Sequence, residues 1–183
     1  MPGERGLSGY NRKFNDTLTV TYKLPTGHGW ARYIYGGWNT SMINSMFSGQ
    51  PVNLTWSPAA NSQISGVLNY RPNQTGEANL EGGDPNNYLD RTTVTVPDAQ
   101  HPYGTAGRNT AKSAPTYQTD LRIQKDFPLH WEKSRLSFQA ECFNVWNKTN
   151  FRAPNANRSN SNYGTITSTF APRIMQFALR FSF

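Results

Sequence analysis

Alternation of apolar and polar residues is the feature that most constrains how this chain can fold. Because successive side chains of a β-strand point to opposite faces of a sheet, such spacing predicts strands with one apolar and one polar face. The same alternation occupies residues 14–24, 119–129 and 135–147. It is clearest at the C-terminal end, where apolar side chains stand at every second position: Met175, Phe177, Leu179, Phe181 and Phe183.

The pattern predicts an all-β fold of antiparallel, amphipathic strands joined by long loops. The alternation is weakest in the second expected strand, where Gly49 and Pro51 predict a bulge or bend. No segment carries apolar residues at helical spacing for long, so we expect no helix beyond about one or two turns. The expected strands are residues 14–24, 36–56, 119–129, 135–147 and 172–183.

Two connections between these strands, residues 57–118 and 148–172, are long, polar and rich in Asn, Gly and Pro. Structureless connections of such length are uncommon in compact soluble domains. The turns that begin at Pro25 and His130 are short by comparison. Short turns that alternate with long loops are typical of outer-membrane barrels, whose turns are periplasmic and whose loops are extracellular.

Composition narrows the classes of function. Charged residues make up 16% and aromatic residues 13% of the chain, which argues against disorder. The net charge is +7, but Lys and Arg are spread singly, so we expect no nucleic acid as partner and favour phosphates of lipopolysaccharide. One cysteine, Cys142, excludes an intramolecular disulfide. No catalytic or metal-ligand spacing occurs, so we expect no enzyme, metal or cofactor.

Several segments together resemble TonB-dependent outer-membrane receptors of the Oar-like type. The resemblance implies a plugged barrel of about 22 strands, located in the outer membrane. It implies the active uptake of a scarce solute with energy supplied through TonB. The matching segments follow one another in order over most of the chain: Trp38 with Phe47–Pro51, Tyr103–Asn109, Asp120–Phe127, Leu136–Asn147, Asn150–Phe151, Tyr163–Ile166 and Ala171–Phe183.

Five strands cannot close a barrel of that size, and residues 1–6 carry no targeting signal. We therefore expect residues 1–183 to form a partial, C-terminal barrel domain, with residues 57–118 and 148–172 as long extracellular loops. The expected partners are outer-membrane lipid, lipopolysaccharide, the barrel-assembly machinery and an unknown transported ligand. TonB would bind through an N-terminal part that lies outside the chain.

Three groups of residues have expected roles in such a barrel. The alternating apolar residues from Met175 to Phe183 resemble the signal that the barrel-assembly machinery reads. Four tryptophans near strand ends would lie at headgroup level: Trp38 and Trp131 at short turns, and Trp56 and Trp146 at long loops. Polar residues that alternate with the apolar ones would face the lumen: Asp120, Arg122, Gln139, Glu141 and Arg180.

Charge pairing predicts the register of the hairpin around residues 130–134. Placing Arg122 directly opposite Glu141 avoids the like-charge pair that the alternative register would make between Asp120 and Glu141. Lys125 stands on the otherwise apolar face of its strand. Because it lies near the short-turn end, we expect its ammonium group to extend to the lipid headgroups.

Two other architectures fit parts of the pattern. A secreted β-sandwich that binds carbohydrate through surface aromatic residues would need strands at regular spacing with short loops. A small, complete outer-membrane barrel of about eight strands would need three further strands between Ser57 and Gln118. Only residues 92–96 alternate in that region.

Overall fold

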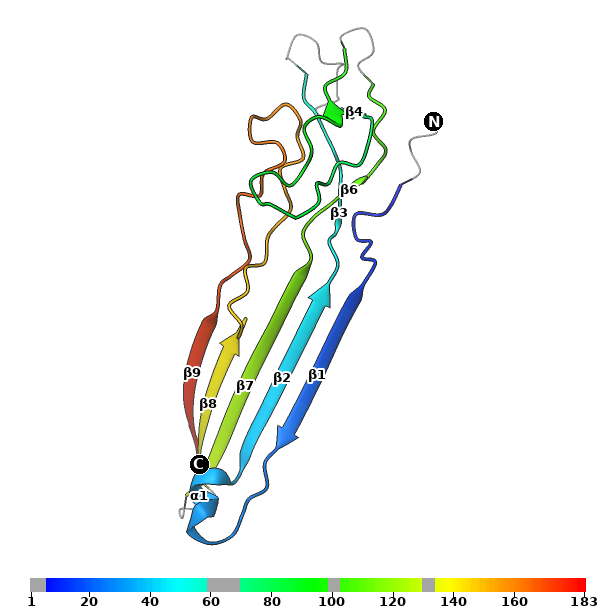
Figure 1. Ribbon diagram of the computed structural model, residues 1–183. Helices are drawn as coiled ribbons and strands as arrows, with labels where there is room; N and C mark the ends of the chain where they lie inside the picture. Colours follow the sequence, from blue (N-terminus) through cyan, green and yellow to red (C-terminus); the bar gives the residue numbers. More distant parts are fainter. Residues whose placement is uncertain (1–5, 59–69, 99–102, 130–133) are drawn as a thin grey trace. The chain divides into compact units, whose positions relative to one another are not determined.

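Figure 1 shows a computed structural model of the chain, which describes residues 6–58, 70–98, 103–129 and 134–183. The chain divides into two compact units, each built from segments that are far apart in the sequence. The strand unit consists of residues 15–46, 117–149 and 171–183. The loop unit consists of residues 1–14, 47–116 and 150–170.

The strand unit is a single sheet of five long strands, which lie side by side in their order along the chain (Figure 1). They are β1 (Asn15–Lys23), β2 (Trp38–Phe47), β7 (Thr116–Pro128), β8 (Arg135–Phe143) and β9 (Ile174–Ser182). The neighbours β7, β8 and β9 pair antiparallel. The sheet is not closed, because within the described ranges β1 and β9 each have a neighbour on one side only. The predicted all-β fold is confirmed.

In the part of the chain that the structure describes, helical residues are confined to the connection between β1 and β2. They form a 3-10 helix, η2 (Gly29–Ala31), and a single turn of α-helix, α1 (Arg32–Tyr35). Neither has the length and the apolar run that a membrane-crossing helix needs. The expectation of no helix beyond a turn or two is confirmed for these residues.

The second strand is shorter than the predicted span of 36–56, since β2 ends at Phe47. The chain leaves the sheet at Gly49, where a Cβ atom would collide with the carbonyl oxygen of Ser113. Only glycine permits so close an approach of two backbones. Beyond it, β3 (Pro51–Val52) pairs antiparallel with β6 (Ala111–Lys112) in the loop unit. The chain therefore leaves the sheet where Gly49 and Pro51 predict a bend, but the predicted strand end at residue 56 is wrong.

The predicted strand at 135–147 also ends early, because β8 stops at Phe143. Asn144 and Asn147 have φ angles of 53° and 50°, in the left-handed region that asparagine tolerates better than most residues. The backbone N–H of Asn147 donates to the carbonyl of Asn144 (2.8 Å). The chain therefore turns out of the sheet at the first of these asparagines.

The loop unit has a hydrophobic core of its own, although its sequence is mostly polar. Besides the β3–β6 ladder, β4 (Asn73–Gln74) pairs antiparallel with β5 (Val94–Thr95). Neither ladder joins the five-stranded sheet, so the described part of residues 57–118 does not supply the strands that a small complete barrel would need. The buried core residues come from separate segments: Leu54, Ala78, Leu89, Val94, Ala111 and Tyr163.

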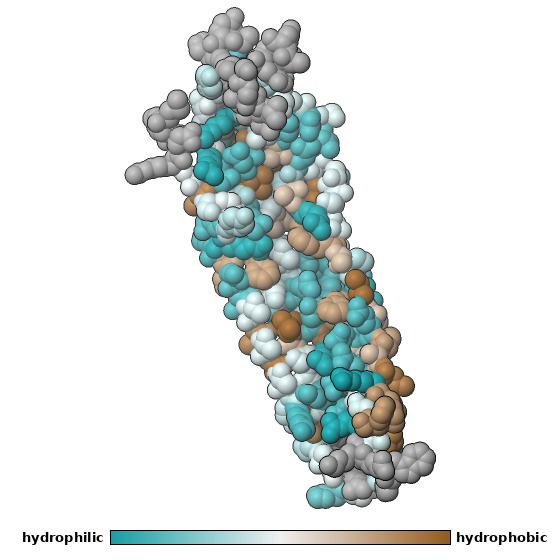
Figure 2. Space-filling view, turned by 180° about the vertical axis from the view of Figure 1, so that it is seen from behind, coloured by the Kyte–Doolittle hydropathy of each residue, from teal (hydrophilic) through white to brown (hydrophobic). Residues whose placement is uncertain are grey.

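The two units differ in how far their apolar side chains are buried. The loop unit encloses Leu54, Leu89 and Val94 completely, whereas every residue of β1 is exposed. Figure 2 shows hydrophobic side chains, coloured brown, on the surface over the strands. A sheet that leaves its apolar side chains exposed needs apolar surroundings to be stable.

Candidate functional site

One face of the sheet carries most of its apolar side chains. The pairing of β7 with β8 sets Ile123 opposite Ala140, and the pairing of β8 with β9 sets Ala140 opposite Phe177. Directly opposed residues of antiparallel strands point to the same face. The predicted sharing of one face is confirmed for these three strands, with Leu121, Ile123, Phe127, Leu136, Phe138, Ala140, Cys142, Met175, Phe177, Leu179 and Phe181 together.

Strands β1 and β2 continue this apolar face. The backbone N–H of Leu24 donates to the carbonyl of Trp38 (2.8 Å), which sets the two residues opposite each other. The ring of Trp38 lies 5.0 Å from the ammonium group of Lys125, whose side chain is on the apolar face of β7. The residues in step with Leu24 along β1 therefore share that face: Leu18, Val20 and Tyr22.

Within the described residues, the apolar side chains of β1 and β9 are left exposed. Phe177 is 67% exposed and Leu179 69% exposed, and Leu18 is exposed by about half. Of the five residues expected to form the assembly signal, Met175, Phe177, Leu179 and Phe181 belong to this face. Phe183, beyond the end of β9, is 98% exposed. An exposed apolar surface of this kind is typical of a surface that contacts lipid or another protein.

The opposite face of β7, β8 and β9 is polar. Arg122 lies directly opposite Glu141 and Gln124 directly opposite Gln139, so the predicted register is confirmed. Arg122 Nε lies 3.8 Å from Glu141 Oε1. Arg122 Nη2 donates to the side-chain oxygens of Gln124 (2.8 Å) and Gln139 (2.7 Å). Arg122 thus links the side chains of two strands.

Amide side chains extend this network along both strands. Gln139 donates to Glu141 (2.8 Å), and Gln124 donates to Asp126 (3.2 Å). Asp126 also lies 3.7 Å from a guanidinium nitrogen of Arg135, diagonally across on β8. Each of these carboxylates therefore has a hydrogen-bond donor or a cation beside it, as polar groups that lose contact with bulk water require.

The polar face holds a groove of about 570 Å³. Its lining residues include three arginines and one aspartate, so the groove is cationic: Arg122, Gln124, Asp126, Arg135, Ser137, Gln139, Ala178, Arg180 and Ser182. Of the residues expected to face the lumen, Glu141 lies beside the groove. Asp120 lies farther along β7, where it accepts hydrogen bonds from the side chain of Gln118 (2.9 Å) and the backbone N–H of Asn144 (2.9 Å).

This arrangement suits the binding of water and of polar or anionic groups. It does not resemble a metal centre, because no three His, Cys, Asp or Glu side chains are grouped within the described residues. The arginines hold permanent positive charge, and the amides offer both donors and acceptors. The face therefore presents positive charge together with hydrogen-bond donors and acceptors.

Two of the tryptophans expected at headgroup level lie at ends of the strands. Trp38, at the start of β2, is partly buried, and its Nε1 donates to the carbonyl of Ile34 (2.9 Å). Trp146 is 75% exposed, and its Nε1 donates to Thr119 Oγ1 (3.1 Å). The position of Trp131 lies outside the described residues.

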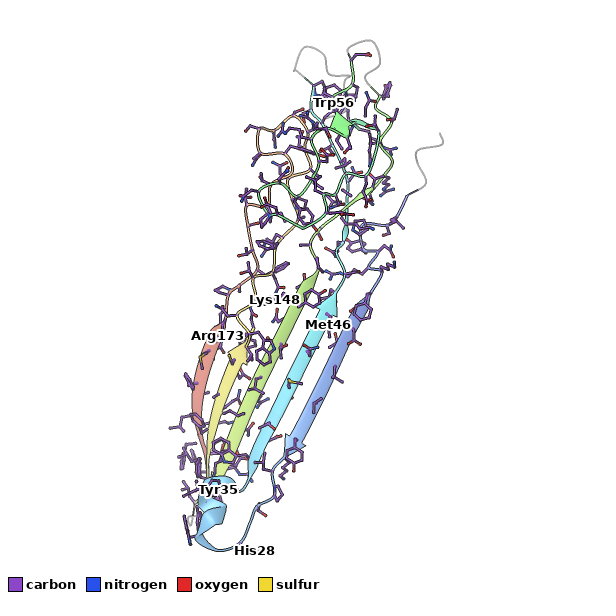
Figure 3. All side chains as sticks on the ribbon, in the orientation of Figure 1. His28, Tyr35, Met46, Trp56, Lys148 and Arg173 are labelled. Carbon is purple, nitrogen blue, oxygen red and sulfur yellow. The ribbon has the colours of Figure 1, made fainter. Side chains whose placement is uncertain are left out.

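Trp56 is placed differently from the expectation. It lies in the loop unit (Figure 3). There it is 7% exposed and packs against Tyr70, with ring centroids 5.7 Å apart. A side chain buried in this way does not present its ring to headgroups. The expectation is wrong because it assumed that the second strand continues to residue 56, whereas β2 ends at Phe47.

Lys125 does not extend outward, contrary to the prediction, and is only 3% exposed. Its Nζ donates to the carbonyls of Tyr33 (2.6 Å) and Ile34 (2.7 Å) in α1. The ammonium group also lies 5.0 Å from the ring centroid of Trp38 and 5.2 Å from that of Phe127. The prediction fails because the connection between β1 and β2 brings acceptors to the lysine.

Two features of the site were not predicted from the sequence: the amide network and the covering of Lys125. The first has a readable signal, since a glutamine stands two residues before a carboxylate in three places on the polar face: Gln118 and Asp120, Gln124 and Asp126, Gln139 and Glu141. Side chains two residues apart on a strand share a face and can bond to each other. The covering of Lys125 is a contact between distant segments and has no such local signal.

The family described as an outer membrane beta barrel domain matches residues 1–176. No curated protein and no solved structure gives a significant match. The match extends over both units, and the amphipathic antiparallel strands agree with the alternation that strands of such domains show.

Proposed function

The chain belongs to the family of outer membrane beta barrel domains, and we propose that it forms the C-terminal strands of a TonB-dependent outer-membrane receptor. The open sheet carries this proposal. Five strands form only a small part of the wall that encloses the plugged lumen of a barrel of about 22 strands. In lipid the free edges of β1 and β9 would leave backbone groups unpaired, so the proposal requires further strands beside them. The order of the motifs from Trp38 to Phe183 supports the receptor family.

In this proposal the apolar face contacts lipid and the polar face lines the lumen. The apolar side chains of β9 then meet acyl chains, and they also form the signal read by the barrel-assembly machinery. The groove with Arg122, Arg135 and Arg180 presents its donors to water and to the plug. A scarce solute would pass along this wall, with energy transmitted through TonB.

We further place the loop unit on the extracellular side and the β1–β2 connection on the periplasmic side, in keeping with the usual lengths of loops and turns. Lys148, just beyond β8, supports the first assignment. Its Nζ lies 4.0 Å from the ring centroid of Tyr117, near the exposed Trp146. A cation among aromatic side chains at that end suits the phosphates of lipopolysaccharide.

The size of the native protein tests the proposal. An antibody raised against residues 78–92 of the loop unit should detect, in purified outer membranes, a protein several times heavier than the 20.6 kDa of this chain. Peptide mass spectrometry of that band should then yield peptides of a plug and of a TonB-binding segment. A band near 20.6 kDa alone would contradict the proposal and favour a small barrel or an assembly of several chains.

A further inference from the structure

We propose that the connection between β1 and β2 is a membrane-interface anchor, which Lys125 clamps to the sheet so that its aromatic side chains lie among phospholipid headgroups. The inference rests on the proposed function in taking the apolar face to contact lipid. It adds a specific device to that face: a buried cation that holds a helical turn in place.

The clamp consists of three hydrogen bonds to two carbonyls. Lys125 Nζ donates to Tyr33 O and Ile34 O, and Trp38 Nε1 also donates to Ile34 O. These carbonyls belong to a helix of one turn and lie near its C-terminal end. The carbonyl end of a helix carries partial negative charge, so a cation is the favoured partner there.

The position of the clamp places the connection on the apolar side of the sheet. Lys125 and Trp38 come from neighbouring strands, β7 and β2, and both side chains are on the apolar face. The connection begins after β1 ends at Lys23 and finishes where β2 starts, so it lies at the ends of the strands. It therefore occupies the boundary between an apolar, lipid-facing surface and water.

The side chains that the connection displays suit this boundary. Trp30 is 75% exposed and Tyr35 69% exposed, while Tyr33 and Ile34 are exposed by about half. Figure 3 shows Tyr35 on the connection at the lower ends of the strands. Trp and Tyr combine an apolar ring with a polar group, and they favour the headgroup level of a bilayer.

The hydrogen bonds of the clamp indicate that the connection lies beside a poorly hydrated medium rather than in bulk water. In water, the carbonyls of a single exposed turn would be satisfied by solvent, and burying a lysine beside them would bring little benefit. Beside lipid, an unbonded carbonyl is costly, so protein donors are needed. A cavity of about 720 Å³ lies beside the clamp and is lined in part by Tyr33, Lys125 and Phe127. The occupant that fits is the glycerol and headgroup layer of phospholipid.

Spin labels can test this placement in the protein inserted into vesicles of phosphatidylethanolamine and phosphatidylglycerol. In a Cys142→Ala background, single cysteines at Trp30 and Tyr35 carry the label on the anchor. A label at Leu179 reports the middle of the apolar face, and one at Ser137 reports the polar face. Collision with oxygen and with a water-soluble nickel complex gives the depth of each label.

We expect the labels at 30 and 35 to lie between the two controls, near the level of the phosphates. Replacing Lys125 with Met should move the label at 35 toward water, and replacing it with Arg, which keeps the cation, should not. An aqueous label at 35 with a deep label at 179 would overturn the anchor alone. No movement with Lys125→Met would overturn the clamp. An aqueous label at 179 would instead refute the lipid-facing assignment of the proposed function.

Discussion

Arg122 and Glu141 face each other directly across β7 and β8, with Nε of the arginine 3.8 Å from Oε1 of the glutamate. The two side chains are 49% and 26% exposed, so water weakens their attraction. Ion pairs in such surroundings contribute up to about 1 kcal/mol to stability. The pair matters more for register, because the alternative pairing would set Asp120 against Glu141.

Reversing one charge of this pair should destabilise the sheet, and reversing both should restore it. We expect Arg122→Glu to lower the free energy of unfolding by about 1 kcal/mol, because like charges then oppose each other. Adding Glu141→Arg should recover most of the loss. Urea titration of the protein folded in lipid vesicles, arranged as a double-mutant cycle, measures the coupling. A double variant no more stable than the single one would mean that the two charges do not interact.

Adjacent positions in β9 should respond oppositely to a new charge. Leu179 is on the apolar face, whereas its neighbour Ala178 lines the polar groove. We expect Leu179→Arg to cost about 2–4 kcal/mol, the cost of an arginine near the middle of a bilayer. Ala178→Arg, the matched control, should cost far less because its side chain meets water. The same vesicle assay compares them, and equal losses would refute the assignment of the two faces.

The loop unit should be stabilised by removing one hydroxyl. Tyr163 is 4% exposed, and within the described residues its hydroxyl has no hydrogen-bond partner. A buried polar group without a partner lowers stability. We expect Tyr163→Phe to slow hydrogen exchange in the loop unit, with a gain of up to about 1 kcal/mol. Tyr103→Phe, at a residue 73% exposed, is the control and should have no effect. Faster exchange in Tyr163→Phe would show that the hydroxyl does have a hydrogen-bond partner.

The same residue should make the loop unit sensitive to alkali. Burial raises the pKa of Tyr163 to about 12, Asp90 adds to the rise, and Arg158 and Arg91 oppose it. An unfolded tyrosine titrates near 10, so the unfolded chain loses this proton first as the pH rises. The stability from the neutral phenol is present below about pH 10 and disappears as the pH approaches 12. Tyr163→Phe should remove that part of the alkaline loss, and an identical pH profile would contradict the assignment.

Glycine at position 49 should be required for the exit from β2. A Cβ there would meet the carbonyl oxygen of Ser113, whereas a Cβ on Gly9, also in the loop unit, would meet nothing within 4 Å. We expect Gly49→Ala to destabilise the protein by more than about 1 kcal/mol. Gly9→Ala should be nearly neutral. Denaturant titration compares the two, and equal effects would show that the backbones at 49 and 113 can move apart.

The strands and their pairing could largely be predicted from the sequence because a local rule governs them. Alternation decides which residues share a face, and the charges of Asp120, Arg122 and Glu141 decide between two registers. The ends of strands depend on other contacts. The end of β2 follows from the approach of Gly49 to Ser113, which are far apart in the sequence. The end of β8 has a local signal in Asn144, because asparagine tolerates positive φ better than most residues.

The core of the loop unit could not be predicted in the same way. Leu54 and Val94 stand in short alternating stretches and Leu89 stands alone among polar residues, so no common period links the three. Their burial depends on how the loops fold against one another. The surroundings of Lys125 have the same origin, since the acceptors at Tyr33 and Ile34 are about ninety residues away in the chain.

Accessibility of single cysteines along β9 tests the central claim, that one face of this sheet contacts lipid, most directly. In a Cys142→Ala background, residues 175–182 are replaced one at a time and exposed to a water-soluble maleimide in outer membranes with permeabilised outer leaflets. We predict that labelling alternates, with positions 176, 178, 180 and 182 reactive and positions 175, 177, 179 and 181 protected. Uniform labelling, or alternation in the opposite phase, would contradict the claim.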